Sequence, residues 1–137
     1  MRSDFAFLFL RLVMGSAFVL HGLPKMQHPT TWAAGALPGA PPWLQLIAAL
    51  AEFLGGAMLA IGFLTPLFAL LIACNMLVAI FVVLVPHGAT FVASGAAESF
   101  ELPLTYLALA FLFVACGPGR FSVDALVRRP RTTRNRR

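Results

Sequence analysis

Glu52 is the side chain with the clearest chemical potential in this sequence, because it is a carboxylate near the middle of an apolar stretch. The stretch covers residues 43–62, and Gln45 is the only other polar side chain in it. About 20 apolar residues span a hydrocarbon core. An ionisable group at that depth costs roughly 2.5 kcal/mol or more, so it mostly faces a protein interior or a wet cavity. Glu52 is therefore predicted to belong to a functional site.

Other polar side chains gather near Glu52 when the apolar segments are phased as helices at about 100° per residue. One end of the predicted bundle collects several of them, and Glu52 lies about 13 Å below that end at roughly 1.5 Å per residue. The candidates are Arg11 and His21 on the first segment, Asn75 and His87 on the third, and Glu101 and Tyr106 on the fourth. This arrangement predicts a polar cavity that opens at one end of the bundle, with Glu52 at its floor.

A purely structural role is the alternative for Glu52. The carboxylate would then pair with Arg11, which the same phasing places in the opposite half of the bundle, or with Asn75, which lies near its own depth. Such a pair would hold the helices together. Lys25 is interpreted as a solvated loop residue, and a plain interfacial histidine is the alternative for His21. Both interpretations of Glu52 stay open on the sequence alone.

The composition places the chain among integral membrane proteins. Hydrophobic residues make up 60% of the sequence and charged residues 11%, with a mean hydropathy of +0.88, which lies well outside the soluble globular range. Four apolar segments are each long enough for one helix, and strand-like alternation is absent. They cover residues 5–22, 43–62, 67–85 and 102–116. We predict an all-α membrane protein, a four-helix transmembrane bundle formed by one domain over residues 1–126.

The basic residues predict the orientation. With an even number of spans both termini share one side, and that side carries nine of the ten basic residues, whereas the other carries only Lys25. The positive-inside rule then places both termini in the cytoplasm, and we expect a multi-pass protein of a bacterial cytoplasmic (inner) membrane. Residues 127–137 form a basic tail, predicted to be disordered, which suits anionic lipid headgroups better than nucleic acid.

The sequence carries no motif for a bound flavin, iron–sulfur cluster or zinc ion. Cys74 and Cys116 lie within apolar segments and lack metal-ligand spacing, so both are interpreted as small buried hydrophobic residues. A CxxCH haem-attachment motif is also missing. A b-type haem between His21 and His87 is an alternative, but two histidines without a known spacing do not favour it.

Four motifs together resemble the DoxX family of small four-helix membrane proteins. They are RLVMGSAFVLHGLPK (11–25), AEFLGGAMLAIGFLTP (51–66), ESFELP with a helix start at Glu101, and GPGRFSVD (117–124). They occur in the family's order and spacing from Arg11 to about Leu126, although Phe121 stands where a Tyr is common. The family is named after a small subunit of a terminal quinol oxidase, similar to a thiosulfate:quinone oxidoreductase subunit. The resemblance therefore implies a four-helix fold and a link to membrane oxidoreductase complexes.

The closing GPGRFSVD motif is interpreted as structural. Gly117, Pro118 and Gly119 end the fourth helix, because Pro cannot continue it and Gly tolerates the required turn. Ser122 is predicted to cap a short helix that carries Asp124 in its first turn.

The resemblance and the predicted cavity lead to one expected function, an integral subunit of a quinone-linked or redox-associated membrane complex. A quinone head would enter among the helices, and the catalytic residues His21, Glu52 and Glu101 would supply hydrogen bonds and protons to its oxygens. The residues expected to bind this cofactor are Arg11, His21, Glu52, Asn75, His87 and Tyr106. Electrons would come from another protein subunit, because no redox motif is present here. Any enzymatic activity would therefore belong to the complex rather than to this chain.

Two other classes of function stay open. The chain is a non-catalytic accessory subunit if its small-residue faces, such as the one with Gly56 and Ala60, hold a larger complex together, or if its site binds a lipid. A small transporter is the third possibility, which is disfavoured because the four segments show no inverted repeat.

Overall fold

The computed structural model describes residues 2–93 and 98–127 of the 137-residue chain. Its helices are α1 (Arg2–Gln27), α2 (Pro42–Ile61), α3 (Thr65–Val78), η1 (Ala79–Leu84), η2 (Val85–His87), α4 (Glu101–Cys116) and α5 (Val123–Val127). The only β-contact among the described residues is an isolated bridge between Thr90 and Ser99. The predicted all-α class is thus confirmed for this part of the chain, and residues 128–137 of the predicted basic tail lie outside it.

Three of the helical stretches are long and apolar enough to cross a membrane. They are α1, α2 and the continuous stretch Thr65–His87, which combines α3, η1 and η2. α4 is apolar as well but has only 16 residues. The described part of the chain is therefore a helical bundle compatible with a membrane, whereas the number of four spans and the orientation of the termini stay predictions.

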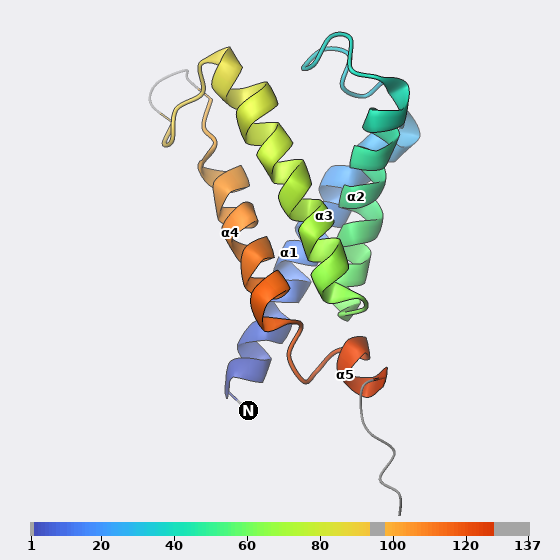
Figure 1. The fold of residues 1–137 in the computed structure, drawn as a ribbon, viewed down its shortest axis with the longest axis vertical. Helices are drawn as coiled ribbons and strands as arrows, with labels where there is room; N and C mark the ends of the chain where they lie inside the picture. Colours follow the sequence, from blue (N-terminus) through green and yellow to red (C-terminus); the bar gives the residue numbers. More distant parts are fainter. Residues whose placement is uncertain (1, 94–97, 128–137) are drawn as a thin grey trace, which may run out of the picture.

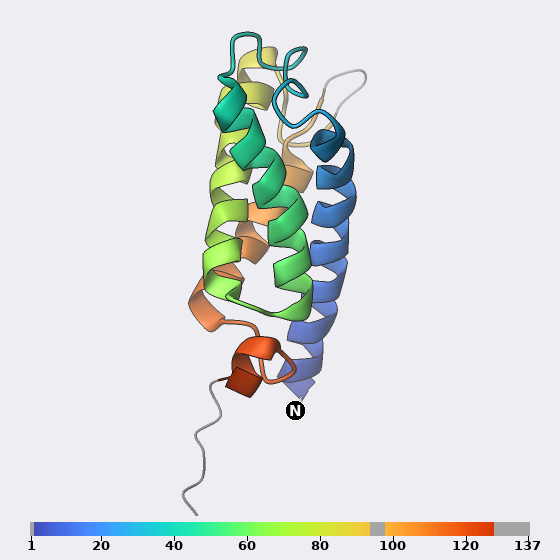
Figure 2. The same cartoon turned by 90° about the vertical axis from the view of Figure 1, so that its right-hand side faces the viewer.

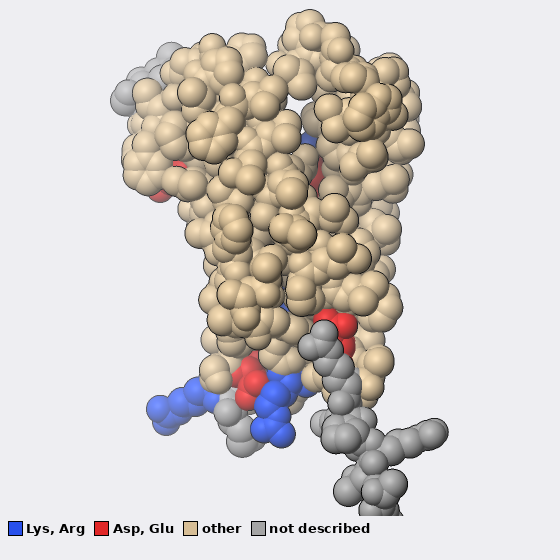
Figure 3. All heavy atoms as spheres, in the orientation of Figure 1, with Lys and Arg blue, Asp and Glu red and all other residues tan. Residues whose placement is uncertain are grey.

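The long helices run side by side, so the molecule has two ends (Figures 1 and 2). We call the end with the connection 28–41 and with residues 88–93 and 98–100 the loop end, and the end with the N-terminus and α5 the α5 end. On the face shown in Figure 3, charged side chains gather at the α5 end, and the surface between the two ends is formed almost wholly by uncharged residues. Such a surface suits a hydrocarbon environment.

Glycines bring α1 and α2 into close contact. A Cβ built on Gly15 would lie 2.6 Å from the carbonyl oxygen of Gly56, and one built on Gly22 would lie 2.5 Å from the backbone nitrogen of Phe53. Neither position has room for a side chain, and this is how small residues join helices in membranes. The two contacts fix the register of α1 against α2.

Proline and glycine set most helix ends. Pro42 is the first residue of α2, where its missing N–H is not needed, and Gly62 follows the helix at φ +73°, a conformation that favours glycine. Pro24, in contrast, lies inside α1, which continues past the predicted end at Gly22 to Gln27. Membrane helices tolerate such prolines. The extension places Lys25 on a helix rather than in a loop.

α3 packs against α2, and α4 packs against α3. Ring contacts of Phe7 with Phe113 and of Phe18 with Tyr106 close the bundle between α1 and α4. The largest fully buried apolar side chains of this core are Met14, Phe18, Leu59, Ile72 and Phe113. In Figure 1, α2 and α3 approach each other near the α5 end and diverge toward the loop end.

The stretch predicted as an ordinary helix over residues 67–85 changes to a π-helix at Ala79. The π segment ends at Leu84, shortly before Pro86, which has no backbone N–H to continue an α-helical pattern. π segments are rare and are frequently found at functional sites. Here Ala79, Val83 and Leu84 line the larger of the two cavities described below.

Candidate functional site

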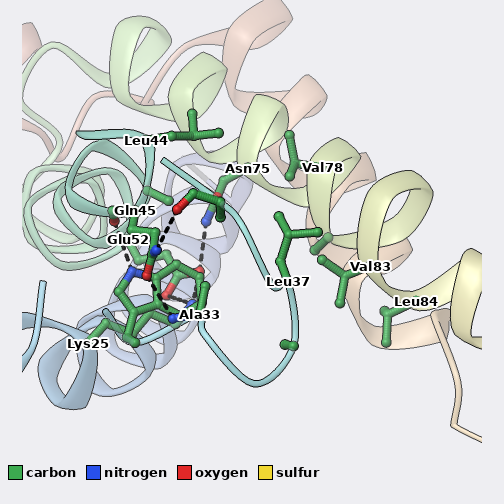
Figure 4. A pocket seen from close by; sticks show the side chains of 15 residues that line it. Lys25, Ala33, Leu37, Leu44, Gln45, Glu52, Asn75, Val78, Val83 and Leu84 are labelled. Carbon is green, nitrogen blue, oxygen red and sulfur yellow. Dashed lines mark hydrogen bonds and ion pairs between the residues drawn. The ribbon is translucent and has the colours of Figure 1, made fainter. Parts of the chain in front are cut away.

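Glu52 on α2 is held by an ion pair with α1 and a hydrogen bond from α3. Both of its carboxylate oxygens lie 2.6 Å from Lys25 Nζ, which donates a hydrogen bond to Oε1, and Asn75 Nδ2 donates to Oε1 at 2.7 Å. The Glu52 side chain is 5% exposed and that of Lys25 is 24% exposed. Among the described residues, nothing donates a hydrogen bond to Oε2. We call Lys25, Glu52 and Asn75 the Glu52 cluster (Figure 4).

The register of α1 and α2 explains why Glu52 meets Lys25. Beyond the glycine contacts, the loop-end continuation of α1 brings Lys25 opposite Glu52, whereas the other direction brings Arg11 against Gly62. Gly62 lies roughly 15 Å from Glu52 along α2 at 1.5 Å per residue. The predicted pairing of Glu52 with Arg11 is therefore wrong, and the alternative pairing with Asn75 is confirmed.

The interpretation of Lys25 as a solvated loop residue is also wrong. Its ammonium group lies 4.2 Å from the centre of the Trp32 ring as well as against the carboxylate of Glu52. A cation over the face of an aromatic ring is stabilised by the ring's negative face. The Lys25 charge is thus held between an anion and an indole.

Gln45 fixes the connection 28–41 over this cluster. Its Oε1 accepts a hydrogen bond from Ala33 N and its Nε2 donates one to Ala40 O, both at 2.9 Å. Its backbone carbonyl accepts a third, from Trp32 Nε1, also at 2.9 Å. Gln45 is buried, so each of these bonds satisfies a polar group that is shielded from solvent. One side chain on α2 therefore ties down both halves of the connection.

A cavity of about 230 Å³ lies beside the Glu52 cluster, between α2, the connection 28–41 and α3; we call it the α2–α3 cavity. Four polar residues form one part of its wall, and the rest is apolar apart from the Trp32 ring nitrogen. The polar part is Lys25, Gln45, Glu52 and Asn75, and the rest is Trp32, Ala33, Ala36, Leu37, Ala40, Leu44, Ala48, Val78, Ala79, Val83 and Leu84. Figure 3 shows a hollow at the loop end in which a basic and an acidic side chain are visible. In Figure 4 the polar residues gather on one side, and Val78, Val83 and Leu84 lie along the other.

A second cavity, of about 170 Å³, lies between α1 and α4; we call it the α1–α4 cavity. Lys25 and Glu52 line it too, so this ion pair forms a wall that both cavities share. Its other lining residues are Phe18, His21, Met76, Leu102, Pro103 and Tyr106. The Tyr106 ring meets the Phe18 ring edge-on, with 5.0 Å between their centres.

The two cavities divide the residues that the sequence nominated. Asn75 lines the α2–α3 cavity, and His21 and Tyr106 line the α1–α4 cavity. Three nominated residues line neither: Arg11 near the α5 end, Glu101 at the exposed start of α4, and His87 in η2, where Nδ1 lies 2.5 Å from Val83 O. The helical rise gives the depth of a residue and the helical phase gives its face. Neither shows which neighbouring helix that face meets, and for this reason the sequence predicted a single site.

Arg11 belongs to a separate polar cluster at the α5 end. Its side chain is fully buried, and Nη2 donates a hydrogen bond to the carbonyl oxygen of Phe121. The guanidinium lies directly against Gly62, where a Cβ would overlap it. Asp124 provides the negative charge that acts on Arg11. We call Arg11, Gly62, Phe121 and Asp124 the Arg11 cluster.

Asp124 also closes the start of α3. Its Oδ1 accepts a hydrogen bond from Leu64 N at 2.8 Å and its Oδ2 accepts one from Thr65 N at 2.9 Å, which satisfies two backbone donors at a helix N-terminus. Ser122 Oγ accepts a hydrogen bond from Ala125 N at 3.1 Å, as predicted for a cap of the short α5. These contacts agree with the structural interpretation of the GPGRFSVD motif.

Three residues of the Glu52 region were missed by the sequence analysis: Lys25, Trp32 and Gln45. Lys25 shares the α1 face of Gly22 by helical phase, a signal that was outweighed by the neighbouring Pro24. Gln45 is the only polar residue besides Glu52 in its apolar stretch, so a structural reason for it was to be expected. Trp32 left no signal, because its position depends on the path of an irregular connection.

The cysteines differ from their prediction. Cys74 and Cys116 are exposed on the bundle surface rather than buried, because their positions on α3 and α4 face away from the core. Within residues 2–93 and 98–127, no group of three or more His, Cys, Asp or Glu side chains is arranged to hold a metal ion.

Comparison with known proteins confirms the predicted family resemblance. The DoxX family model matches residues 6–85, a stretch that contains the complete Glu52 cluster. The motifs at Glu101 and at residues 117–124 lie outside the match. No curated protein and no solved structure matches the chain. Because the family model covers more than half of the 137 residues and the helices are long and apolar, the chain is a membrane protein of the DoxX family.

Proposed function

We propose that this protein is the membrane subunit of an oxidoreductase complex and that it binds the ring of a lipid-soluble quinone in the α2–α3 cavity. The observation that carries the proposal is the Glu52 cluster itself: a buried ion pair and an amide on the wall of an otherwise apolar cavity. Ligand sites commonly combine a mostly apolar lining with a few polar groups that orient the ligand.

The size and chemistry of the cavity suit one substituted ring. An engineered cavity of about 150 Å³ binds benzene, so about 230 Å³ has room for a ring with small substituents. The donors on its polar wall, Lys25 Nζ and Asn75 Nδ2, match the carbonyl oxygens of a quinone. Val78, Val83 and Leu84 provide apolar contact for the ring and the start of its isoprenoid tail.

Reduction of a quinone consumes two electrons and two protons and yields the quinol. In this proposal the electrons come from a redox centre in a partner subunit, because the sequence carries no motif for one. The Lys25–Glu52 pair supplies the protons, since an acid–base pair beside the reacting oxygens can donate one proton and then recover it. Asn75 keeps Glu52 in position through its hydrogen bond.

The accessory-subunit alternative has less support than the sequence suggested. Gly56 and Ala60, the small residues of its proposed contact face, lie against Gly15 and are used for contact between α1 and α2 within this chain. That face is therefore occupied and does not offer a surface for another subunit. A lipid acyl chain in the α2–α3 cavity would form no hydrogen bond with the polar wall, and a few polar groups in a mostly apolar lining are typical of sites that orient a ligand with polar atoms.

Tryptophan fluorescence tests the proposal directly. The chain has two tryptophans, so Trp43→Phe leaves Trp32, which lines the α2–α3 cavity, as the single reporter. A short-chain quinone titrated into this variant in lipid vesicles should quench the fluorescence with saturation. Adding Ala48→Phe, which fills the cavity, should abolish the saturable part.

The matched control is Ala108→Phe, the same change on the exposed surface of α4. Collisional quenching from the lipid phase affects both variants equally, so it cancels in the comparison. Equal saturable quenching in Ala48→Phe and Ala108→Phe would contradict the quinone site.

The proposed location is a bacterial cytoplasmic membrane, with the α5 end on the cytoplasmic side. Arg2 and Arg120 lie at the α5 end, whereas Lys25 lies at the loop end. Six further arginines follow Val127 in the sequence. The positive-inside rule supports this orientation. A reporter fused after Arg137 should show a cytoplasmic location, and a tag inserted at the exposed Gly35 should be accessible from outside. The reverse pattern would contradict the orientation.

A further inference from the structure

The two cavities share the Lys25–Glu52 ion pair but differ in their other polar side chains. Lys25 and Glu52 contribute to both cavities, but the residues around them differ. The α2–α3 cavity adds only Asn75 and Gln45 as further polar side chains apart from the Trp32 ring, whereas the α1–α4 cavity adds two titratable ones, His21 and Tyr106. His21 is exposed near the loop end of α1.

The Glu52 cluster has spare capacity for hydrogen bonds. Glu52 Oε2 is shielded from solvent and lies 2.6 Å from the Lys25 ammonium group, but it accepts no hydrogen bond from the described residues, so it can still accept one from water. The side chains of Tyr106 and His21 make no hydrogen bond to another described residue. Four polar groups with spare bonding capacity therefore line the α1–α4 cavity: Lys25, Glu52, His21 and Tyr106.

We infer that the α1–α4 cavity holds water and is the passage through which protons pass between solution at the loop end and the Lys25–Glu52 pair. A water site needs room and two to four polar partners, and about 170 Å³ with four such groups fulfils both conditions. The two cavities then have different roles. The α2–α3 cavity admits a ligand from the lipid phase, and the α1–α4 cavity exchanges protons with water.

The delivery of these protons to a quinone depends on the proposed function. In each round the Lys25–Glu52 pair first gives a proton to a ring oxygen of the quinone. A proton from solution then reaches the pair through the water of the passage, and the pair returns to its starting state. Two such rounds supply the two protons of the quinol. Lys25 from α1 and Asn75 from α3 contact Glu52. The other polar side chains that share a cavity with it are His21 from α1, Tyr106 from α4, Trp32 from the connection 28–41 and Gln45 from its own helix.

Thiol chemistry tests the water passage independently of any quinone. Charged, membrane-impermeant methanethiosulfonate reagents react with a thiolate, which forms only where water is present. Met76 lines the α1–α4 cavity and is 7% exposed. In the background Cys74→Ala with Cys116→Ala, the only thiol of a Met76→Cys variant therefore reports on water inside the cavity.

The native Cys74 is the matched control. It lies on the same helix as Met76, about 3 Å away along the axis, but is exposed on the bundle surface, which a membrane covers with lipid. Two proteins are compared in vesicles of uncharged phospholipid: the Met76→Cys protein described above, and a Cys116→Ala variant that keeps Cys74. The methanethiosulfonate reagent should label Cys at position 76 about tenfold faster than Cys74, because only the cavity thiol meets water. Equal or slower labelling of Met76→Cys would overturn the passage.

A second reporter covers the case in which Met76→Cys does not fold. Leu102 lines the same cavity from the start of α4 and is 54% exposed, so Leu102→Cys disturbs the core less. Rapid labelling there supports the passage, and no labelling at either position overturns it. If the Trp32 fluorescence shows no saturable quenching but the thiols are labelled rapidly, the quinone site is wrong and the water passage stands. If the quenching is saturable but the thiols are not labelled, the water passage is wrong and the quinone site stands.

Discussion

The Glu52 cluster and the Arg11 cluster both bury charge between α1 and α2, but their surroundings differ. At the α5 end, the guanidinium of Arg11 fills the space beside Gly62 so completely that a Cβ would overlap it. At the loop end, Lys25 and Glu52 line two cavities. The two cations lie about four turns apart on one side of the same helix, yet one is packed on all sides by protein and the other faces open space.

This difference shows that a buried charge does not by itself mark a functional site. The sequence nominated both Arg11 and Glu52 for one site, because both are ionisable residues at membrane depth. Packing separates them: a charge fully enclosed by protein, like Arg11, can only hold helices together, whereas a charge beside a cavity can meet a ligand. The predictions below test this contrast, beginning with the largest expected effect.

Asp124→Ala should cause the largest loss of stability, about 3 kcal/mol. It leaves the buried Arg11 without its nearby negative charge and removes the acceptors for Leu64 N and Thr65 N. Thermal unfolding in detergent measures the loss, and saturable quenching of Trp32 in the folded protein should be unchanged. The double variant with Arg11→Met should lose less than the sum of the two single changes. Strict additivity would show that the two charges act separately.

Gly62→Ala should cost about 2 kcal/mol, since a residue with a Cβ is strained at this φ and also displaces Arg11. Gly39→Ala is the matched control, because Gly39 has φ +84° but open space around it. The control should show only the backbone strain, at about 1 kcal/mol. Chemical unfolding of both variants gives the difference. If the two losses are equal, the α5 end is less tightly packed than the comparison requires.

Glu52→Gln should cost less stability, about 1 kcal/mol, because Lys25 is partly exposed and keeps its contact with the Trp32 ring. Quinone affinity, however, should fall about tenfold, since the amide cannot hold the Lys25 ammonium in place as a carboxylate does. The Trp32 titration measures the affinity. A variant with lost stability and normal affinity would make the Glu52 cluster a structural one like the Arg11 cluster.

Thr65→Val should change stability least, by about 0.5 kcal/mol or less in either direction. The Thr65 hydroxyl is buried and has no hydrogen-bond partner among the described residues, so a methyl group of similar shape replaces it without breaking a contact. Thermal unfolding provides the measurement. A large loss would reveal a bound water at the α5 end and would weaken the contrast between the two ends.

Much of the fold could be predicted from the sequence, because the bilayer restricts the choice of structure. Hydrocarbon leaves backbone groups without water, so long apolar segments have to form helices. The end of α4 before Gly117 followed from turn chemistry, and its start at Glu101 followed from the family resemblance. The end of α1 was missed, because Pro24 interrupts a helix in water more often than in a membrane. The π segment at Ala79 was missed as well, since nothing in its apolar sequence distinguishes it from an α-helix.

The candidate site was predicted only in part. Glu52 and its contact with Asn75 followed from depth along the helices, which the rise per residue provides. The ion pair of Glu52 with Lys25 was missed, because it depends on the register of α1 against α2. Glycine contacts between residues far apart in the sequence set this register. The contact of Asp124 with the start of α3 joins residues 59 and 60 positions apart, and no local pattern carries that information.

Gln45 holds the connection 28–41 mainly through backbone groups, at Ala33 and Ala40, and this separates two properties of the protein. The methyl groups of Ala36 and Ala40 border the cavity without contributing to those bonds. Larger side chains there would exclude bulkier ring substituents and leave the ion pair on the opposite wall intact. Under the proposed function, selectivity and reactivity are therefore encoded in different stretches of the chain, so an evolving or redesigned protein can change which molecule enters the cavity without changing the groups that react with it.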